Sequence, residues 1–274
     1  MYVNAAFLKV RLATNFARRI ELGRAGAVGI PPANLRAFTG YVAGSCHNPP
    51  HGSIRFQTSN MITALWLSVL ILSIIAHEVA HGYAADSLGD PTARLAGRLT
   101  LNPIPHIDLM GSIAIPALLV LSGSPIFFGW AKPVPYNPYN LRNQRWGETF
   151  VALAGSATNI LLACVFGLIV RFGASFGLGA TALSFAMTIS FINLFLGLFN
   201  LVPIPPLDGF TALRSALPWS LSSKLEHLER NIRSMGVFSL ILFLLIFSYL
   251  FAQPFFTLVL WLFGLLTGNS GNGI

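Results

Sequence analysis

Charged residues are scarce in this chain, and acidic ones are the scarcest. Only 9% of the 274 residues are charged, and nine of them are Asp or Glu. An ordinary soluble domain carries about 25% charged residues. Hydrophobic residues make up 54% of the chain and aromatic residues 12%. The composition excludes an ordinary soluble domain and predicts an integral, multi-pass membrane protein in contact with the lipid bilayer.

Cysteines and internal repeats are also lacking. The two cysteines, Cys46 and Cys164, are too few and too far apart for a disulfide framework or a cysteine-ligated zinc site. A membrane transporter or metal-permeation protein is an alternative of a different class, and many such proteins carry internal repeats. The sequence shows no repeat of this kind.

The net charge of +8 comes mostly from the N-terminal region. Residues 1–55 hold seven of the 17 Lys and Arg residues and a single Glu. No basic patch elsewhere is interleaved with aromatic residues, so we expect no binding to nucleic acid. We expect residues 1–60 to be a basic arm, either disordered or lying on a membrane surface, without an ordinary signal peptide. An alternative is that translation begins natively at Met61, where the first apolar segment opens.

Long apolar segments define the expected fold. Three segments, 62–85, 148–172 and 180–201, have the length and composition of membrane-spanning helices. A fourth, 236–266, carries Gln253-Pro254 in its middle and predicts either a hairpin or one kinked helix. We therefore expect an all-α polytopic membrane protein with three core transmembrane helices and a C-terminal apolar helix or hairpin. Residues 61–217 form the expected core, and residues 218–274 hold an amphipathic stretch and the last apolar segment.

Two shorter segments carry separate predictions. Residues 94–101 have the pattern of a short, membrane-associated β segment, which could pair with an extended peptide. Residues 109–128 are apolar but are interrupted by two glycines and two prolines, Gly111, Pro116, Gly123 and Pro125. We expect this second stretch to be re-entrant or interfacial.

The residues His77-Glu78-Val79-Ala80-His81 follow 16 uncharged residues, from Met61 to Ala76. Two histidines four positions apart lie on one face of a helix and can reach one zinc ion, and the glutamate between them can act as a general base. Ionisable residues inside a membrane helix are costly, so such a cluster indicates a function. The alternative is a polar cluster that joins helices by hydrogen bonds.

A catalytic zinc site usually has three protein ligands. His106, Asp108 and Asp208 are the candidates in or near apolar sequence. Asp208 ends the run Asn200-Leu-Val-Pro-Ile-Pro-Pro-Leu-Asp208, whose three prolines break the preceding helix. Broken backbone within a membrane is tolerated where it lines a cavity, which suits a rigidly held ligand. The alternative is an aspartate that caps the turn before Gly209.

With these motifs in this order, the chain resembles the site-2 protease family of intramembrane zinc metalloproteases. The sequence Ala154-Gly-Ser-Ala-Thr-Asn159 resembles the family's small-residue motif, although Ser156 stands where the family usually has proline. Shorter motifs between residues 89 and 135 resemble a compact bacterial branch. The resemblance covers about residues 61–217.

The resemblance implies a role for each matching residue. It implies that His77, His81 and Asp208 bind Zn²⁺, that Glu78 is the catalytic base and that Asn200 assists the substrate carbonyl. His106 and Asp108 match no ligand of the family. The implied activity is hydrolysis of a peptide bond in or near a transmembrane segment of another protein. A catalytically silent scaffold of the same fold is the remaining alternative, and the intact Glu78 argues against it.

The metal site also predicts the topology. If residues 109–128 crossed the membrane, His77 and Asp208 would lie at opposite faces and could not share a zinc ion. If they do not cross, nearly all basic residues of the core fall on one side: Arg94, Arg98, Lys132, Arg142, Arg145, Arg214, Lys224, Arg230 and Arg233. Basic residues mark the cytoplasmic side. We therefore expect an active site that opens toward the cytoplasm, in a bacterial inner membrane.

Overall fold

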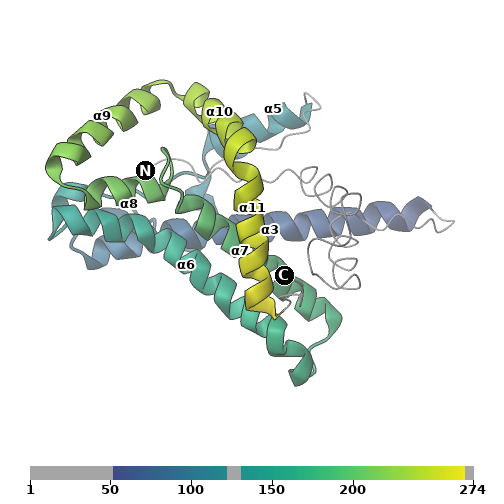
Figure 1. The fold of residues 1–274 in the computed structure, drawn as a ribbon. Helices are drawn as coiled ribbons and strands as arrows, with labels where there is room; N and C mark the ends of the chain where they lie inside the picture. The colour runs from purple at the N-terminus through teal and green to yellow at the C-terminus, as the bar shows by residue number, and fades with distance from the viewer. Residues whose placement is uncertain (1–51, 122–130, 269–274) are drawn as a thin grey trace.

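The computed structural model describes residues 52–121 and 131–268 (Figure 1). In these two ranges the chain is helical, with connecting loops and no β-strand. The α-helices are α3 (Gly52–Ser87), α4 (Thr92–Leu95), α5 (Ile115–Leu121), α6 (Gln144–Gly173), α7 (Ala180–Asn200), α8 (Asp208–Ala216), α9 (Trp219–Ser234), α10 (Val237–Ile246) and α11 (Ala252–Thr267). Two π-helical segments are η2 (Leu109–Ala114) and η5 (Phe247–Phe251), and three single 3-10 turns are η1 (Ile104–His106), η3 (Pro138–Asn140) and η4 (Ala174–Phe176).

Four helices in the described part are long and apolar enough to cross a membrane. Their spans are Leu65–Ser87, Trp146–Phe176, Ala180–Asn200 and Phe247–Thr267. These match the four apolar segments of the sequence, so the prediction of a mostly helical, multi-pass membrane protein is confirmed. The first helix is longer than its apolar segment, because α3 begins at Gly52. Residues 52–60 of the predicted arm are thus helical, and residues 1–51 lie outside the described ranges.

Helices α3, α6 and α7 form the central bundle (Figure 1). Helix α6 packs closely on both of the other helices. A Cβ atom at Gly197 of α7 would lie only 2.8 Å from Ile160 and 3.1 Å from the backbone oxygen of Ser156. Small residues permit such close approach, and van der Waals packing drives helix association within membranes. The order of the contacts along each pair of helices shows that α3 and α7 run in one direction and α6 in the other.

The predicted re-entrant stretch does not form a spanning helix in its described part. Segments η2 and α5 hold 6 and 7 residues, which together span about 20 Å. The hydrocarbon core of a bilayer is about 30 Å thick. The N–H of Lys132 donates to the carbonyl oxygen of His106 at 2.8 Å, so the chain returns to the point from which it departed. Residues 122–128 of the predicted stretch lie outside the described ranges.

The C-terminal apolar block is a single bent helix and not a hairpin. Helix α10, the π-helical η5 and α11 follow one another without a break. Pro254 has no N–H and its ring clashes with the carbonyl four residues earlier, which accounts for the wider turns just before it. Phe247 and Phe255 pack on Phe199 of α7, with ring centroids 5.2 and 6.0 Å apart. These aromatic contacts hold the bent helix against the bundle.

The prediction of a β segment at residues 94–101 is wrong in this structure. Residues 92–95 form the single helical turn α4, and Gly97 has a left-handed conformation with φ of +65°. The burial of Arg98, within the predicted segment, has a different origin. Arg98 is 7% exposed because its guanidinium binds backbone carbonyls of a segment 34 and 35 residues later, which no local pattern reveals.

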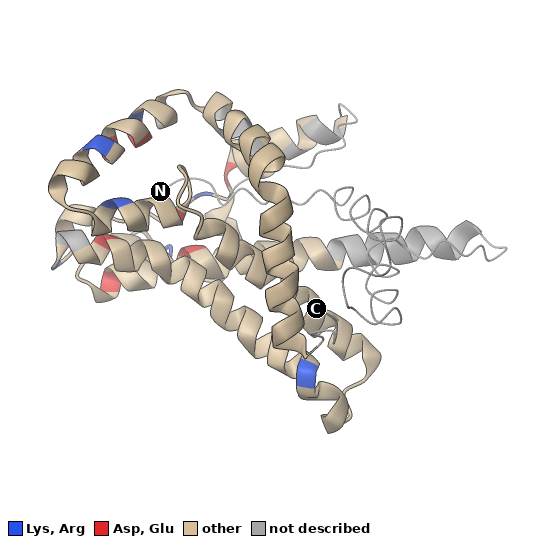
Figure 2. Ribbon diagram, in the orientation of Figure 1, with Lys and Arg blue, Asp and Glu red and all other residues tan. Residues whose placement is uncertain are grey.

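Charged residues gather at one end of the bundle. Figure 2 shows most of the ribbon coloured for charged residues around α8, α9 and the adjoining end of α6. Arg171, in the last turn of α6, lies at the opposite end of that helix. The structure therefore keeps the charge asymmetry that the sequence predicts for a chain in which residues 109–128 do not cross the membrane.

Candidate metal centre

Helix α3 carries two histidines one turn apart on the face that packs against α6. His77 is 1% exposed, and the side chain of His81 is 12% exposed. Their Nε2 atoms lie 3.0 Å apart, and the rings meet edge to face with centroids 4.6 Å apart. Both imidazoles therefore point to one place, as a spacing of four residues on a helix leads one to expect.

Asp208 comes to the same place from the other end of the chain. It is the first residue of α8, directly after the proline-rich break that follows α7. Its Oδ2 atom lies 2.9 Å from Nε2 of His77 and 3.3 Å from Nε2 of His81. Gly209 allows the close turn, since a Cβ atom there would lie 2.2 Å from the backbone oxygen of Leu201.

These three side chains have the donor set of a zinc site. Their ligand atoms all lie within 4.8 Å of one another, and they are the one such group of His, Cys, Asp and Glu in the described ranges. Two imidazole nitrogens and one carboxylate oxygen are ligands that zinc commonly takes. The group therefore fits the metal that the sequence predicts.

A hydrogen bond to the main chain determines which ring nitrogen of His81 carries a proton. Its Nδ1 atom lies 2.6 Å from the backbone carbonyl oxygen of Val151 on α6, so Nδ1 carries the proton and donates. In the neutral ring, Nε2 then carries the lone pair, which is directed at the shared centre. A histidine that binds metal usually donates its other N–H to a carbonyl or a carboxylate in this way. The Nδ1 atom of His77 is buried and has no partner within the described residues.

Gly155 on α6 makes room for the two imidazoles. A Cβ atom at this position would lie 2.6 Å from Cε1 and Nε2 of His77 and 2.6 Å from Nε2 of His81. Real Cβ atoms essentially never approach so closely. The small-residue motif at 154–159 thus has a physical reason at Gly155, where any side chain would enter the candidate metal centre.

Glu78 is buried beside the histidines, with 7% of its surface exposed. Its Oε2 atom accepts the backbone N–H of Val134 at 3.0 Å. The proline-rich segment from residue 131 onward, far along the chain, therefore lies directly against this carboxylate. A carboxylate next to the metal ligands, held by a backbone donor, has the position that a general base requires.

Asn200 closes α7 and is 3% exposed. Its Nδ2 atom donates to the carbonyl oxygen of Leu196 at 3.0 Å, within its own helix. This bond uses one of the two N–H groups of the amide, and the second remains for another acceptor.

The other two candidates from the sequence lie outside the group of three. His106 is 2% exposed and its Nε2 atom pairs with the carbonyl oxygen of Thr100 at 2.9 Å. Burial and the nearby Arg98 hold the pKa of His106 below its ordinary value, so this ring is neutral at pH 7. Asp108 caps η2, where its side chain accepts the N–H of Gly111 at 2.7 Å. The side chains of both residues therefore make their hydrogen bonds within the loop, away from His77, His81 and Asp208.

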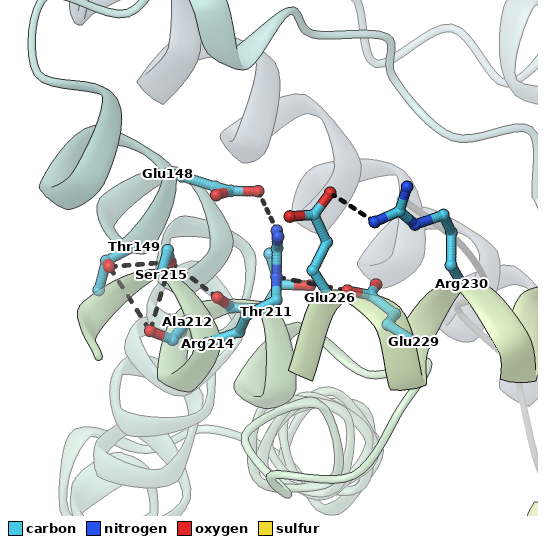
Figure 3. A network of polar contacts seen from close by, with 9 residues as sticks. All are labelled: Glu148, Thr149, Thr211, Ala212, Arg214, Ser215, Glu226, Glu229 and Arg230. Atoms are coloured by element: carbon cyan, nitrogen blue, oxygen red, sulfur yellow. Dashed lines mark hydrogen bonds and ion pairs between the residues drawn. The ribbon is translucent and has the colours of Figure 1, made fainter. Parts of the chain in front are cut away.

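A polar network fixes α8, and therefore Asp208, to its neighbours (Figure 3). Arg214 binds Glu148 of α6 at 2.5 Å and Glu229 of α9 at 3.3 Å. The side chains of all three are at most 15% exposed. Ser215 adds a hydroxyl contact of 3.0 Å to Thr149 of α6. The helix that begins with Asp208 is thus held at its far end by charge and hydrogen bonds.

Asp90 organises the loop between α3 and α6. It is fully buried and accepts hydrogen bonds from the backbone N–H of Asn137 at 2.6 Å, from Nδ2 of Asn140 at 2.8 Å, and from the N–H and hydroxyl of Thr92. Burial alone would raise the pKa of the Asp90 carboxyl, but these hydrogen bonds outweigh it and hold the pKa below its usual range.

Two backbone groups of the site carry no signal in the sequence. The carbonyl of Val151 and the N–H of Val134 belong to ordinary apolar residues, and their roles depend on where the fold brings them. The close approach at Gly155 could have been suspected from its place in the small-residue motif.

Comparison with known proteins gives consistent matches. The family model for peptidase family M50 matches residues 173–245. YwhC of Bacillus subtilis, named as a candidate zinc metalloprotease, is 38% identical over 200 residues, which cover 70% of this chain and 82% of that protein. Rip2 of Mycolicibacterium smegmatis, named in the same way, is 30% identical over 208 residues, or 74% of this chain and 73% of its own.

Similarity at lower identity extends to the zinc metalloprotease MJ0392 of Methanocaldococcus jannaschii. It is 23% identical over 164 residues, which cover 60% of this chain and 38% of that protein. No solved structure gives a significant match. On the strength of its bacterial relatives, which align over most of both lengths, the chain belongs to peptidase family M50, the site-2 protease family.

Proposed function

We propose that this protein is a zinc-dependent intramembrane endopeptidase that hydrolyses peptide bonds in or near transmembrane segments of other membrane proteins. One observation carries the proposal. Two histidine nitrogens and an aspartate oxygen converge beside a buried glutamate, at the end of apolar helices. Family membership and relatives named as zinc metalloproteases support the same chemistry.

His77, His81 and Asp208 would hold the zinc ion. When bound, zinc acts as a Lewis acid and lowers the pKa of a coordinated water toward about 7. The side chain of Asp208 is 23% exposed and that of His81 is 12% exposed, so the centre can be reached from outside the protein.

Glu78 would move the protons of the reaction. Its carboxylate accepts a proton from the attacking water and later delivers it to the nitrogen of the leaving amine. The bond from the Val134 N–H fixes one carboxylate oxygen and so sets the direction in which the carboxylate faces. A base held in this way starts from its productive orientation.

Asn200 would donate the second N–H of its amide to the substrate carbonyl, whose oxygen becomes negatively charged during attack. One such donor typically contributes about 3 kcal/mol to stabilising the transition state. Its bond to Leu196 fixes the amide plane before a substrate arrives.

The substrate is inferred from the setting of the site. The candidate centre lies at the end of three apolar helices, where a transmembrane segment of another protein can approach laterally within the bilayer. A helical segment hides its carbonyl groups in hydrogen bonds, so it must unwind before hydrolysis. We place the site on the cytoplasmic side of a bacterial inner membrane, because the basic residues of the core gather at that end of the bundle.

The decisive experiment compares wild type with Glu78→Gln. Both are purified in detergent, loaded with zinc and given a model transmembrane substrate. We expect Glu78→Gln to keep its zinc and to lose turnover by about 10²- to 10⁴-fold. Glu226→Gln is the matched control, since Glu226 lies on α9 and its side chain is 46% exposed. Cleavage by Glu78→Gln at the wild-type rate would contradict the proposed role of this residue.

A further inference from the structure

Lys132, Pro133 and Val134 form a short segment whose backbone is held at both ends. The N–H of Lys132 donates to the carbonyl of His106 at 2.8 Å. At the other end, the N–H of Val134 donates to Oε2 of Glu78 at 3.0 Å. This segment therefore connects the loop after α4 with the proposed catalytic base.

Arg98 holds the carbonyl side of the same segment. Its Nη2 atom donates to the carbonyl oxygen of Lys132 at 2.8 Å and to that of Pro133 at 3.2 Å. The Arg98 side chain thus joins two loops whose contacting residues are 34 and 35 positions apart in sequence. Its guanidinium binds the carbonyl groups of the two residues that precede Val134.

The burial of Arg98 is unusual for its surroundings. Only 7% of it is exposed, and the carbonyl oxygens of Lys132 and Pro133, which accept its hydrogen bonds, are neutral. Arginine is almost never fully buried unless it is paired. Burial lowers the pKa of the Arg98 guanidinium, and the negative charge of Glu78 opposes this shift. Arg98 thus lies within electrostatic range of the proposed base while bonding to the segment that touches it.

The composition of the segment makes its position critical. Pro133 and Pro135 have no N–H group, so Val134 supplies the one backbone donor at positions 133–135. The orientation of that donor depends on the peptide groups around it, and Arg98 binds two of them. A shift of the segment would move the N–H away from Glu78 with no neighbouring donor to replace it.

We propose that Arg98 is a positioning residue for the catalytic base: it fixes the Lys132–Val134 segment so that the Val134 N–H orients the Glu78 carboxylate. The inference rests on the proposed function, in which Glu78 is the base. The hydrogen bonds of Arg98 to the two carbonyls make the segment the route by which it acts on Glu78.

The first test separates positioning from folding. Arg98→Met is compared with Arg94→Met, which removes the same charge four residues earlier in the chain, from a side chain that is 65% exposed and paired with Asp86. We expect Arg98→Met to lower kcat by about 100-fold, with KM nearly unchanged and zinc content equal to that of wild type. Arg94→Met should retain wild-type kcat. Arg98→Lys should recover part of the loss, since an ammonium can reach one of the two carbonyls.

The second test removes the donor itself. Val134→Pro lacks the N–H, whereas Val134→Ala keeps it and reports the cost of the lost side chain alone. We expect kcat of Val134→Pro to fall about 100-fold below that of Val134→Ala. Both changes break the same connection, which runs from Arg98 through the Lys132–Val134 segment to Glu78. The double variant Arg98→Met, Val134→Pro should therefore have a kcat no more than about threefold below that of the less active single variant.

A third measurement does not depend on catalysis. Amide hydrogen exchange of a peptide covering residues 131–136 should be faster in Arg98→Met than in wild type, and unchanged in Arg94→Met. If exchange quickens but wild type cleaves nothing, the proposed function fails while the contact role of Arg98 stands. Unchanged exchange, wild-type kcat in Arg98→Met, or multiplying effects in the double variant would each overturn the proposal for Arg98.

Discussion

The Nδ1 atom of His81 lies 2.6 Å from the backbone carbonyl oxygen of Val151, across two helices that run in opposite directions. A histidine on α3 is therefore oriented by the main chain of α6. Because helix packing sets this distance, the geometry of the candidate metal centre is a property of the bundle. Changes to the bundle, its charges and its loops should therefore alter that centre in predictable ways.

Loss of any one of the three proposed ligands should abolish stable zinc binding. We expect metal analysis of purified wild type to give about one zinc per chain, as a single three-ligand site requires. His77→Ala, His81→Ala and Asp208→Ala should each bind far less. Undiminished zinc in any of these variants would remove that residue from the ligand set. His106→Ala is the control, since His106 lies outside the group of three.

Gly155→Ala should disturb the two histidines without adding charge. The new methyl group would lie within 2.6 Å of both imidazoles, so the rings or the helix must shift. We expect weaker zinc binding, measured by competition with a chelator, and lower turnover. Gly179→Ala is the matched control, because nothing lies within 4 Å of a Cβ atom there. Equal zinc affinity in both variants would show that the site accommodates the methyl group.

Arg214→Met should loosen α8 and thereby the proposed ligand at its start. The change leaves Glu148 and Glu229 without their shared partner, and breaking a buried ion pair costs about 3–5 kcal/mol. We expect a clear fall in the melting temperature and in zinc affinity. Arg230→Met removes an exposed pair with Glu226, worth about 0.3–0.5 kcal/mol, and should change little. If the two variants behaved alike, the network in Figure 3 would not support α8.

Asp90 should make stability depend on pH in a predictable direction. Its pKa in the folded protein lies below the usual value, so its ionised form stabilises the fold above an unfolded pKa of about 3.9. This stability is lost as the pH falls through the folded pKa. Asp90→Asn should lower the melting temperature at pH 7, by an amount equivalent to about 2 kcal/mol, and the difference should shrink below about pH 4. A difference in melting temperature between wild type and Asp90→Asn that stays constant with pH would contradict this prediction. Glu226→Gln is the control, since the Glu226 side chain on α9 is 46% exposed.

The topology can be tested by labelling single cysteines in a variant that lacks the native cysteines. Asn102→Cys and Asn140→Cys lie before and after the stretch that we predict not to span the membrane, and both positions are exposed. Ser175→Cys lies in the turn between α6 and α7, at the other end of α6. In intact cells an impermeant maleimide should reach Ser175→Cys alone. Labelling of Asn102→Cys and Asn140→Cys from opposite sides would place a crossing between them.

The sequence predicts the helices well because apolar length is a local property. The predicted segments 148–172 and 180–201 correspond to α6 and α7 within a few residues. The convergence of His77 and His81 follows from helix geometry, and the place of Asp208 follows from its broken helix and the family resemblance. The pattern around Arg98 is misleading, because its burial depends on carbonyls that only the folded chain brings near. The contributions of Val134 and Val151 are main-chain contacts, so their side chains could not predict them.

The hydrogen bond between the His106 carbonyl and the Lys132 N–H has a consequence for engineering and for evolution. This hydrogen bond closes the loop of residues 107–131 at its base. The number of residues in this loop therefore does not set the position of the segments that follow it. Insertions or replacements in this loop can change its contacts with the membrane or with other proteins, while the packing of the helix bundle stays the same. Relatives with the same centre could thus diverge in this stretch, and a reporter tag could be placed in it, without redesigning the rest.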